Sequence, residues 1–185
     1  MKRVLMMLVA AATAAAATYD VDPVHSSVTF KIQHMGTSWT YGRFNDLAAS
    51  LEYDAAKPEA SSLSFTAKAE SVDTGNAKRD QHLKGPDFFN AKEFPEIAFK
   101  STKVTPSGKD AAEVTGDLTL HGVTKPVTAK VVKVGEGKTM KGGEMIGFEA
   151  TFTVKRSDFG MANMVGPKGA GDEVYLTVAI EAHKK

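Results

Sequence analysis

The alternation of apolar and polar residues predicts a mainly β protein, a single antiparallel barrel of about eight strands. Turn-forming residues recur at short spacing and no strand–helix–strand rhythm appears, which indicates antiparallel pairing. Several alternating stretches exceed the usual length of about five or six residues, and long strands favour a closed barrel over a small sandwich. One stretch near residues 76–91 breaks the alternation and predicts a short helical insertion.

Residues 1–17 are typical of a secretory signal peptide. Met1-Lys2-Arg3 is cationic, the apolar run after it is too short to span a bilayer, and the segment ends in small residues up to Ala17. Its removal would leave 168 of the 185 residues and change the formal net charge from +1 to −1. We therefore expect a periplasmic or secreted protein with one domain over residues 18–185.

Composition excludes several classes of function. The absence of cysteine excludes disulfides, thiolate catalysis and zinc–thiolate sites. A net charge near zero gives no basis for binding nucleic acid, whose phosphates need a basic surface. No two histidines lie two or four residues apart, so local spacing predicts no metal site and no cofactor, although ligands distant in the sequence could still converge. Neither a G-x-S-x-G nor a P-loop pattern is present.

The first half of the barrel is predicted from four stretches. Residues 27–33 form a strand with one apolar face, and residues 62–70 form another. Between them, 37–44 and 47–53 predict a hairpin that turns at Asn45-Asp46.

The helical insertion comes next in the chain. Residues 76–83 are compatible with a helix that Gly85-Pro86 ends. Phe88, Phe89 and Phe94 follow close together. A charged helix followed by aromatic residues predicts a lid or mouth over an apolar space.

The second half resumes the strands. Residues 96–104 and 114–121 alternate, and Gly122 allows a tight turn into 125–134. A glycine-rich loop over 135–143 precedes two further strands, at 146–155 and 174–183.

A barrel of about eight strands either fills with side chains or holds one slender ligand. The residues expected to face inward are Phe30, Ile32, Phe65, Phe99, Leu118, Leu120, Phe148 and Phe152. Those expected to line the opening are Trp39, Phe44, Phe88, Phe89, Phe94, Phe159, Met161 and Met164. Both sets have a structural alternative, as plain core packing and as a second cluster that seals one barrel end.

Cationic residues on the helical insertion predict a site for a polar head group. Arg79 and His82 share a helix face, and with Lys84 they could hold a phosphorylated head at the cavity mouth. His34 is a further candidate at the mouth. The alternative is that Arg79 and Asp80 pin the helix to neighbouring strands.

Short motifs in order along the chain resemble the YceI-like family of exported bacterial proteins. The motifs are YDVDPVHS at 19–26, FKIQHMG at 30–36, GRF at 42–44, DTG at 73–75, RDQHL at 79–83, FPEIAF at 94–99, GDLTLHGVTK at 116–125 and RSDFG at 156–160. The resemblance implies a lipocalin-like barrel with an elongated apolar cavity that binds isoprenoid lipids or other long-chain amphiphiles. It attaches no firm catalytic reaction to the chain.

We therefore expect an exported lipid carrier, with no cofactor apart from its bound lipid. Its expected partners are the lipid ligand and, transiently, a membrane or a membrane cytochrome. The protein is expected to be a monomer or homodimer. Two alternatives stay open: an enzyme that acts on such a lipid through His and acidic residues at the mouth, or a stress-linked interaction protein with a filled barrel.

Overall fold

The computed structural model describes residues 16–185, so almost all of the predicted signal peptide lies outside the described residues. Eleven strands and one α-helix make up the described chain. Their bounds are β1 Ala17–Val21, β2 Ser27–His34, β3 Ser38–Phe44, β4 Leu47–Tyr53, β5 Ser62–Lys68, β6 Val72–Asp73, α1 Ala77–Leu83, β7 Glu96–Pro106, β8 Ala111–Leu120, β9 Val123–Lys138, β10 Glu144–Lys155 and β11 Ala170–Lys184. Single 3₁₀ turns lie at Pro58–Ala60, Ala69–Ser71 and Arg156–Phe159.

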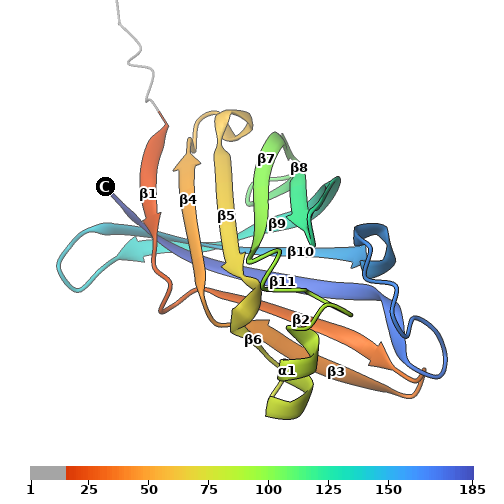
Figure 1. Ribbon diagram of the computed structural model, residues 1–185. Coiled ribbons are helices and arrows are strands. Elements are labelled where there is room, and N and C mark those ends of the chain that lie inside the picture. Colours follow the sequence, from red (N-terminus) through yellow and green to blue (C-terminus); the bar gives the residue numbers. More distant parts are fainter. Residues whose placement is uncertain (1–15) are drawn as a thin grey trace, which may run out of the picture.

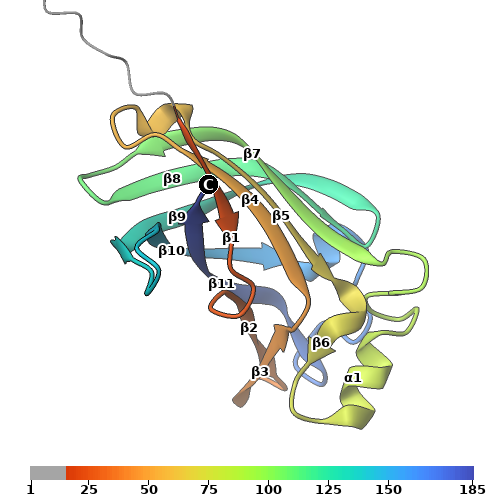
Figure 2. The same cartoon turned by 90° about the vertical axis from the view of Figure 1, so that its left-hand side faces the viewer.

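The predicted barrel is confirmed, because antiparallel pairing closes the sheet into a ring. Neighbours follow the order β1, β4, β5, β7, β8, β9, β10 and β11, and β11 pairs back with β1 (Figure 1). At this seam Tyr19 lies opposite Lys184, so the C-terminal end of the chain lies beside β1 (Figure 2). The sequence analysis predicted no strand at residues 17–21.

One edge of the last strand pairs with β10, and its other edge has two partners in succession. Residues Ala170 to Ala179 of β11 pair with β2, whereas Ala182 to Lys184 pair with β1. Strands β2 and β3 form a hairpin at this end of the sheet, and β6 pairs with the end of β3. Part of the barrel wall is therefore formed by three strands, β2, β3 and β6, that extend the sheet beyond the closed ring.

The predicted hairpin between 37–44 and 47–53 is wrong. β3 pairs with β2 and β6, whereas β4 pairs with β1 and β5. The Asn45-Asp46 corner does not fold back on itself, because the backbone N–H of each residue donates to Ser71 instead. The hairpin turn lies instead between β2 and β3, where Met35 and Gly36 adopt positive φ.

The predicted helix is present as α1. The Asn76 side chain accepts a hydrogen bond from the Arg79 backbone N–H at 3.0 Å and so caps the helix start. After Leu83 the backbone turns sharply, and the Phe89 N–H donates to the Leu83 carbonyl. Figure 1 shows α1 beside β6 at one end of the barrel.

The later strands agree with the sequence pattern, with one difference. Gly135 and Gly137, expected in a loop, belong to β9, whose pairing with β10 shifts at Gly147 and Phe148. His121 and Gly122 both adopt positive φ between β8 and β9, as a tight two-residue turn requires. Among residues 16–185, no helix is long and apolar enough to cross a membrane.

Candidate binding cavity

A cavity of about 570 Å³ lies inside the barrel. This volume is within the range of roughly 300–1,000 Å³ that small-molecule sites occupy. Its wall is made by β2–β5, β7–β11 and α1, with inward residues at alternate positions of each strand. The barrel interior is therefore not filled with side chains.

Aromatic and aliphatic side chains form the body of the cavity wall. Phe30, Phe99, Phe148 and Phe152 are only partly buried, because the cavity reaches their rings. The buried residues around them form three separate clusters instead of one continuous core. The wall also includes Ile32, Phe44, Phe65, Phe88, Phe89, Leu118, Leu120, Met161 and Met164, all of them expected from the sequence.

The charged and imidazole side chains on the wall gather at the α1 end. The cationic and imidazole side chains there are His34, Arg79, His82, Arg156 and Lys168. Two contacts bring their segments together: the Met35 N–H donates to the Gly169 carbonyl at 2.8 Å, and Phe88 contacts both His82 and Arg156. Among the described residues that line the cavity there is no aspartate or glutamate. This end of the cavity therefore carries positive charge with no acidic side chain on its wall.

Arg156 holds the backbone in place at this end of the cavity. Its side chain is only 5% exposed, and it continues the inward face of β10 beyond Val154. The guanidinium donates to four backbone carbonyls of the segment that follows, those of Met161, Asn163, Ala170 and Gly171. Burial lowers the pKa of Arg156, although the nearby Asp172 carboxylate opposes this effect.

Arg79 has a bracing role as well as a place on the wall. Its Nε donates to the Thr74 hydroxyl at 2.7 Å, and Nη2 donates to the Thr74 carbonyl at 2.8 Å. The Asp80 carboxylate accepts from the Thr74 backbone N–H at 2.9 Å and from its hydroxyl. The geometry thus supports the alternative that Arg79 and Asp80 pin the helix.

Four residues expected at the site lie off the cavity wall. Trp39 points outward, because its neighbour Thr40 faces inward, and it packs against Tyr175 and under the Lys31 ammonium group. The other three, Phe94, Phe159 and Lys84, pack or pair elsewhere.

Phe94 packs edge-on against the His121 ring, with centroids 4.8 Å apart, beside the β8–β9 turn. Phe159 is 2% exposed and belongs to the cluster beneath the wall. The Lys84 ammonium lies 3.4 Å from the Glu70 carboxylate, in a polar groove outside the barrel. None of the three reaches the cavity, so the expected mouth loses one cation and two aromatic rings.

Some wall residues were not expected from the sequence. Arg156 and Lys168 supply charge, and Gln33 and Thr40 supply hydrogen-bonding groups. The inward position of Arg156 was predictable from the alternation of β10, because Arg156 lies two residues past the inward-facing Val154. Lys168 lies in an irregular segment, where no periodicity exists to place it.

Comparison with known proteins agrees with this architecture. The YceI-like domain matches residues 19–182. A UPF0312 protein of Ectopseudomonas mendocina (strain ymp) is 45% identical over 170 residues, which cover 91% of this chain and 88% of that protein. The crystal structure of Burkholderia cenocepacia BcnA has a TM-score of 0.79 at 28% identity and covers 88% of this chain and 99% of its own.

A more distant structure shares the fold. A polyisoprenoid binding domain from Saccharophagus degradans, implicated in plant cell wall breakdown, has a TM-score of 0.65 at 15% identity. The match covers 92% of this chain and 99% of that domain. At this identity the likeness shows a common barrel alone.

Proposed function

Because the chain belongs to the YceI-like family, we propose that it is an exported carrier that holds an isoprenoid or another long-chain amphiphile in its barrel. The observation that carries the proposal is the asymmetry of the cavity, with an apolar body and an end that has cations and no acids. A hydrocarbon tail fits the body, and an anionic or hydrogen-bond-accepting head fits the α1 end. The same barrel also occurs in a polyisoprenoid binding domain, so the fold is compatible with this ligand class.

The energetics favour reversible carriage. Burial of a chain of about 16 carbons contributes on the order of 12 kcal/mol before ordering costs. A bilayer offers the same chain nearly the same burial, so the preference for protein over membrane is small. The head group then decides the balance, which suits a protein that loads from and unloads to membranes.

Binding has better support than catalysis. An enzyme of the alternative kind would place a carboxylate beside a histidine at the mouth, to serve as an acid–base pair. The described cavity wall has His34 and His82 but no acidic side chain. His82 does lie 3.6 Å from the Asp87 carboxylate, but both side chains are more than half exposed.

Native mass spectrometry of the protein purified from its host, followed by organic extraction, tests the carrier proposal. We expect a co-purifying lipid with a long hydrocarbon tail, and a mature N-terminus near Thr18 if the chain is exported. An empty protein that takes up neither a polyprenol nor a polyprenyl phosphate from vesicles would contradict the proposal. Turnover of the extracted lipid would support the enzyme instead.

A matched ligand pair tests the head-group end. Arg79→Ala should weaken binding of a polyprenyl phosphate more than binding of the uncharged polyprenol with the same tail. The reason is that the alanine removes a bidentate phosphate donor but no part of the apolar body. Equal losses for the two ligands would leave Arg79 with its bracing role alone.

A further inference from the structure

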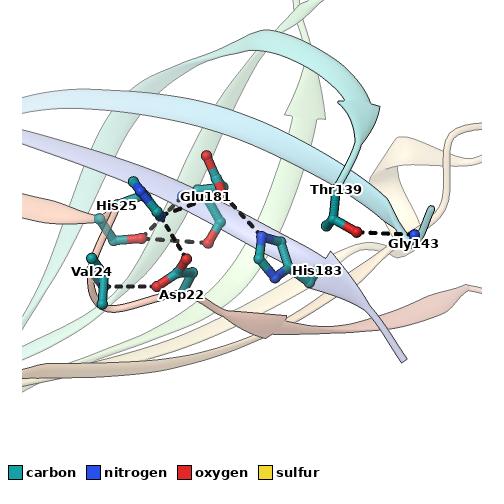
Figure 3. A network of polar contacts seen from close by, with 8 residues as sticks. Asp22, Val24, His25, Thr139, Gly143, Glu181 and His183 are labelled. Atoms are coloured by element: carbon teal, nitrogen blue, oxygen red, sulfur yellow. Dashed lines mark hydrogen bonds and ion pairs between the residues drawn. The ribbon is translucent and has the colours of Figure 1, made fainter. Parts of the chain in front are cut away.

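Four potential metal ligands converge on the outer surface of the barrel, away from the lipid cavity. Asp22 and His25 lie in the connection between β1 and β2, and Glu181 and His183 lie near the end of β11. Figure 3 shows the four side chains pointing toward one another. They meet where β11 changes its partner from β2 to β1.

Strand geometry explains why the sequence pattern did not reveal this cluster. Glu181 and His183 are two residues apart on β11, so they share its outer face, while Ala182 between them faces inward and is fully buried. Asp22 and His25 come from the opposite end of the chain. The spacing rule for histidine pairs therefore could not bring the two halves together.

The distances between the ligand atoms suit a small tetrahedral cation. His25 Nδ1 lies 2.7 Å from Asp22 Oδ2 and 3.8 Å from Glu181 Oε1, and His183 Nε2 lies 3.0 Å from the same Oε1. Ligand atoms of Asp22, Glu181 and His183 all lie within 4.8 Å of one another. Zinc bonds of about 2.0–2.1 Å place tetrahedral ligands roughly 3.3 Å apart. His25 lies outside this set of three, and its exposed side chain would have to rotate to bring Nδ1 to the fourth position.

Backbone hydrogen bonds hold the two segments in register. The Asp22 N–H donates to the Glu181 carbonyl at 2.9 Å, and the Glu181 N–H donates to the Ser26 hydroxyl at 3.0 Å. The Val24 N–H donates to Asp22 Oδ1 at 2.8 Å. This bond orients the carboxylate and leaves Oδ2 on the side of the histidine, as outer contacts of metal ligands commonly do.

The charges also match a divalent cation. Two carboxylates and two neutral imidazoles carry a charge of −2 in total. Without a metal, the contact with Asp22 raises the pKa of His25, and the contact with His25 lowers the pKa of Asp22. A metal ion would compete with protons for both imidazoles, since it binds their neutral form.

We propose that Asp22, His25, Glu181 and His183 bind one divalent transition-metal ion, with zinc as the best-fitting probe. The ion would join the β1–β2 connection to β11 at the seam of the barrel. Because it binds the folded chain, it would stabilise the closed barrel by an amount that grows with the logarithm of its concentration above Kd. The site is independent of the lipid, since none of the four residues lines the cavity.

The experiment uses the protein without an affinity tag, after dialysis against a chelator. Isothermal titration with zinc should give one site per chain, and zinc should raise the melting temperature. His183→Ala and His25→Ala should each weaken zinc binding at least about tenfold, since each removes one of four ligands. Both side chains are partly exposed, so both variants should remain folded.

His82→Ala is the matched control, because this histidine also lies near a carboxylate, that of Asp87, but belongs to no group of three potential ligands among the described residues. It should bind zinc as the unaltered protein does. Cobalt bound at the site should show the intense visible absorption of a four-coordinate ion, and His183→Ala should lose it. The proposal is overturned if the unaltered protein binds no zinc, or if both ligand variants bind it as tightly as the control.

Discussion

Replacement of Arg156 by methionine tests whether one buried cation holds the charged end of the cavity together. The side chain donates to carbonyls of Met161 and Asn163, after η3, the 3₁₀ turn Arg156–Phe159, and to that of Gly171 at the start of β11. Methionine keeps much of the length and apolar surface but donates no hydrogen bond. We expect the substitution to release this segment and to lower the free energy of unfolding.

The size of this loss in the free energy of unfolding follows from the number and length of the hydrogen bonds that Arg156 donates. Three of the four are short, at 2.7, 2.7 and 2.9 Å, and the fourth is 3.4 Å long. A hydrogen bond to a charged group contributes about 1.5–3 kcal/mol. The gross loss of roughly 4–9 kcal/mol is offset by relief of the several kcal/mol that burial of the guanidinium costs. Water entering from the cavity also reduces the loss, so we expect a net destabilisation of about 2–4 kcal/mol.

Urea unfolding followed by circular dichroism measures this loss. Arg79→Met is the matched control, because this exposed arginine also lines the cavity but donates only to Thr74. The control should lose about 0.5–1 kcal/mol. Hydrogen exchange of residues 161–171 should rise in the Arg156 variant alone. Equal stabilities for the two variants would refute the reasoning.

Two further substitutions test the apolar wall and the acid response. Phe152→Asp should abolish retention of the co-purifying lipid, whereas Thr153→Asp, on the outer face of the same strand, should keep it; circular dichroism checks that both fold. Burial alone would raise the pKa of Asp172, but hydrogen bonds from Ser157 lower it below 3.8. The protein should therefore lose stability as pH falls below about 4, and Asp172→Asn should make this loss shallower in acid unfolding curves. An unchanged slope would contradict this account.

The barrel was predictable because its signal is repeated in every strand. Phe148 and Phe152 alternate with polar neighbours over the length of β10, and only one register puts that face inside. The same parity correctly places Phe30 and Leu118 on the cavity wall. The helix start was predictable from local chemistry, since Asn76 caps it through its own side chain.

Features that depend on distant contacts were not predictable. Asn45-Asp46 has turn chemistry, but hydrogen bonds to Ser71 hold the corner open, and no local pattern encodes them. Trp39 is a different case, because it was assigned to the mouth by residue type although the local alternation of β3 turns it outward. The cluster of His25 and His183 depends on a seam that joins the two ends of the chain.

That seam has a consequence for how the protein folds. Tyr19 pairs with Lys184, so the contacts between β1 and β11 cannot form until the final strand has left the ribosome. Such a high contact order makes folding slow. Until synthesis is complete, the ring cannot close.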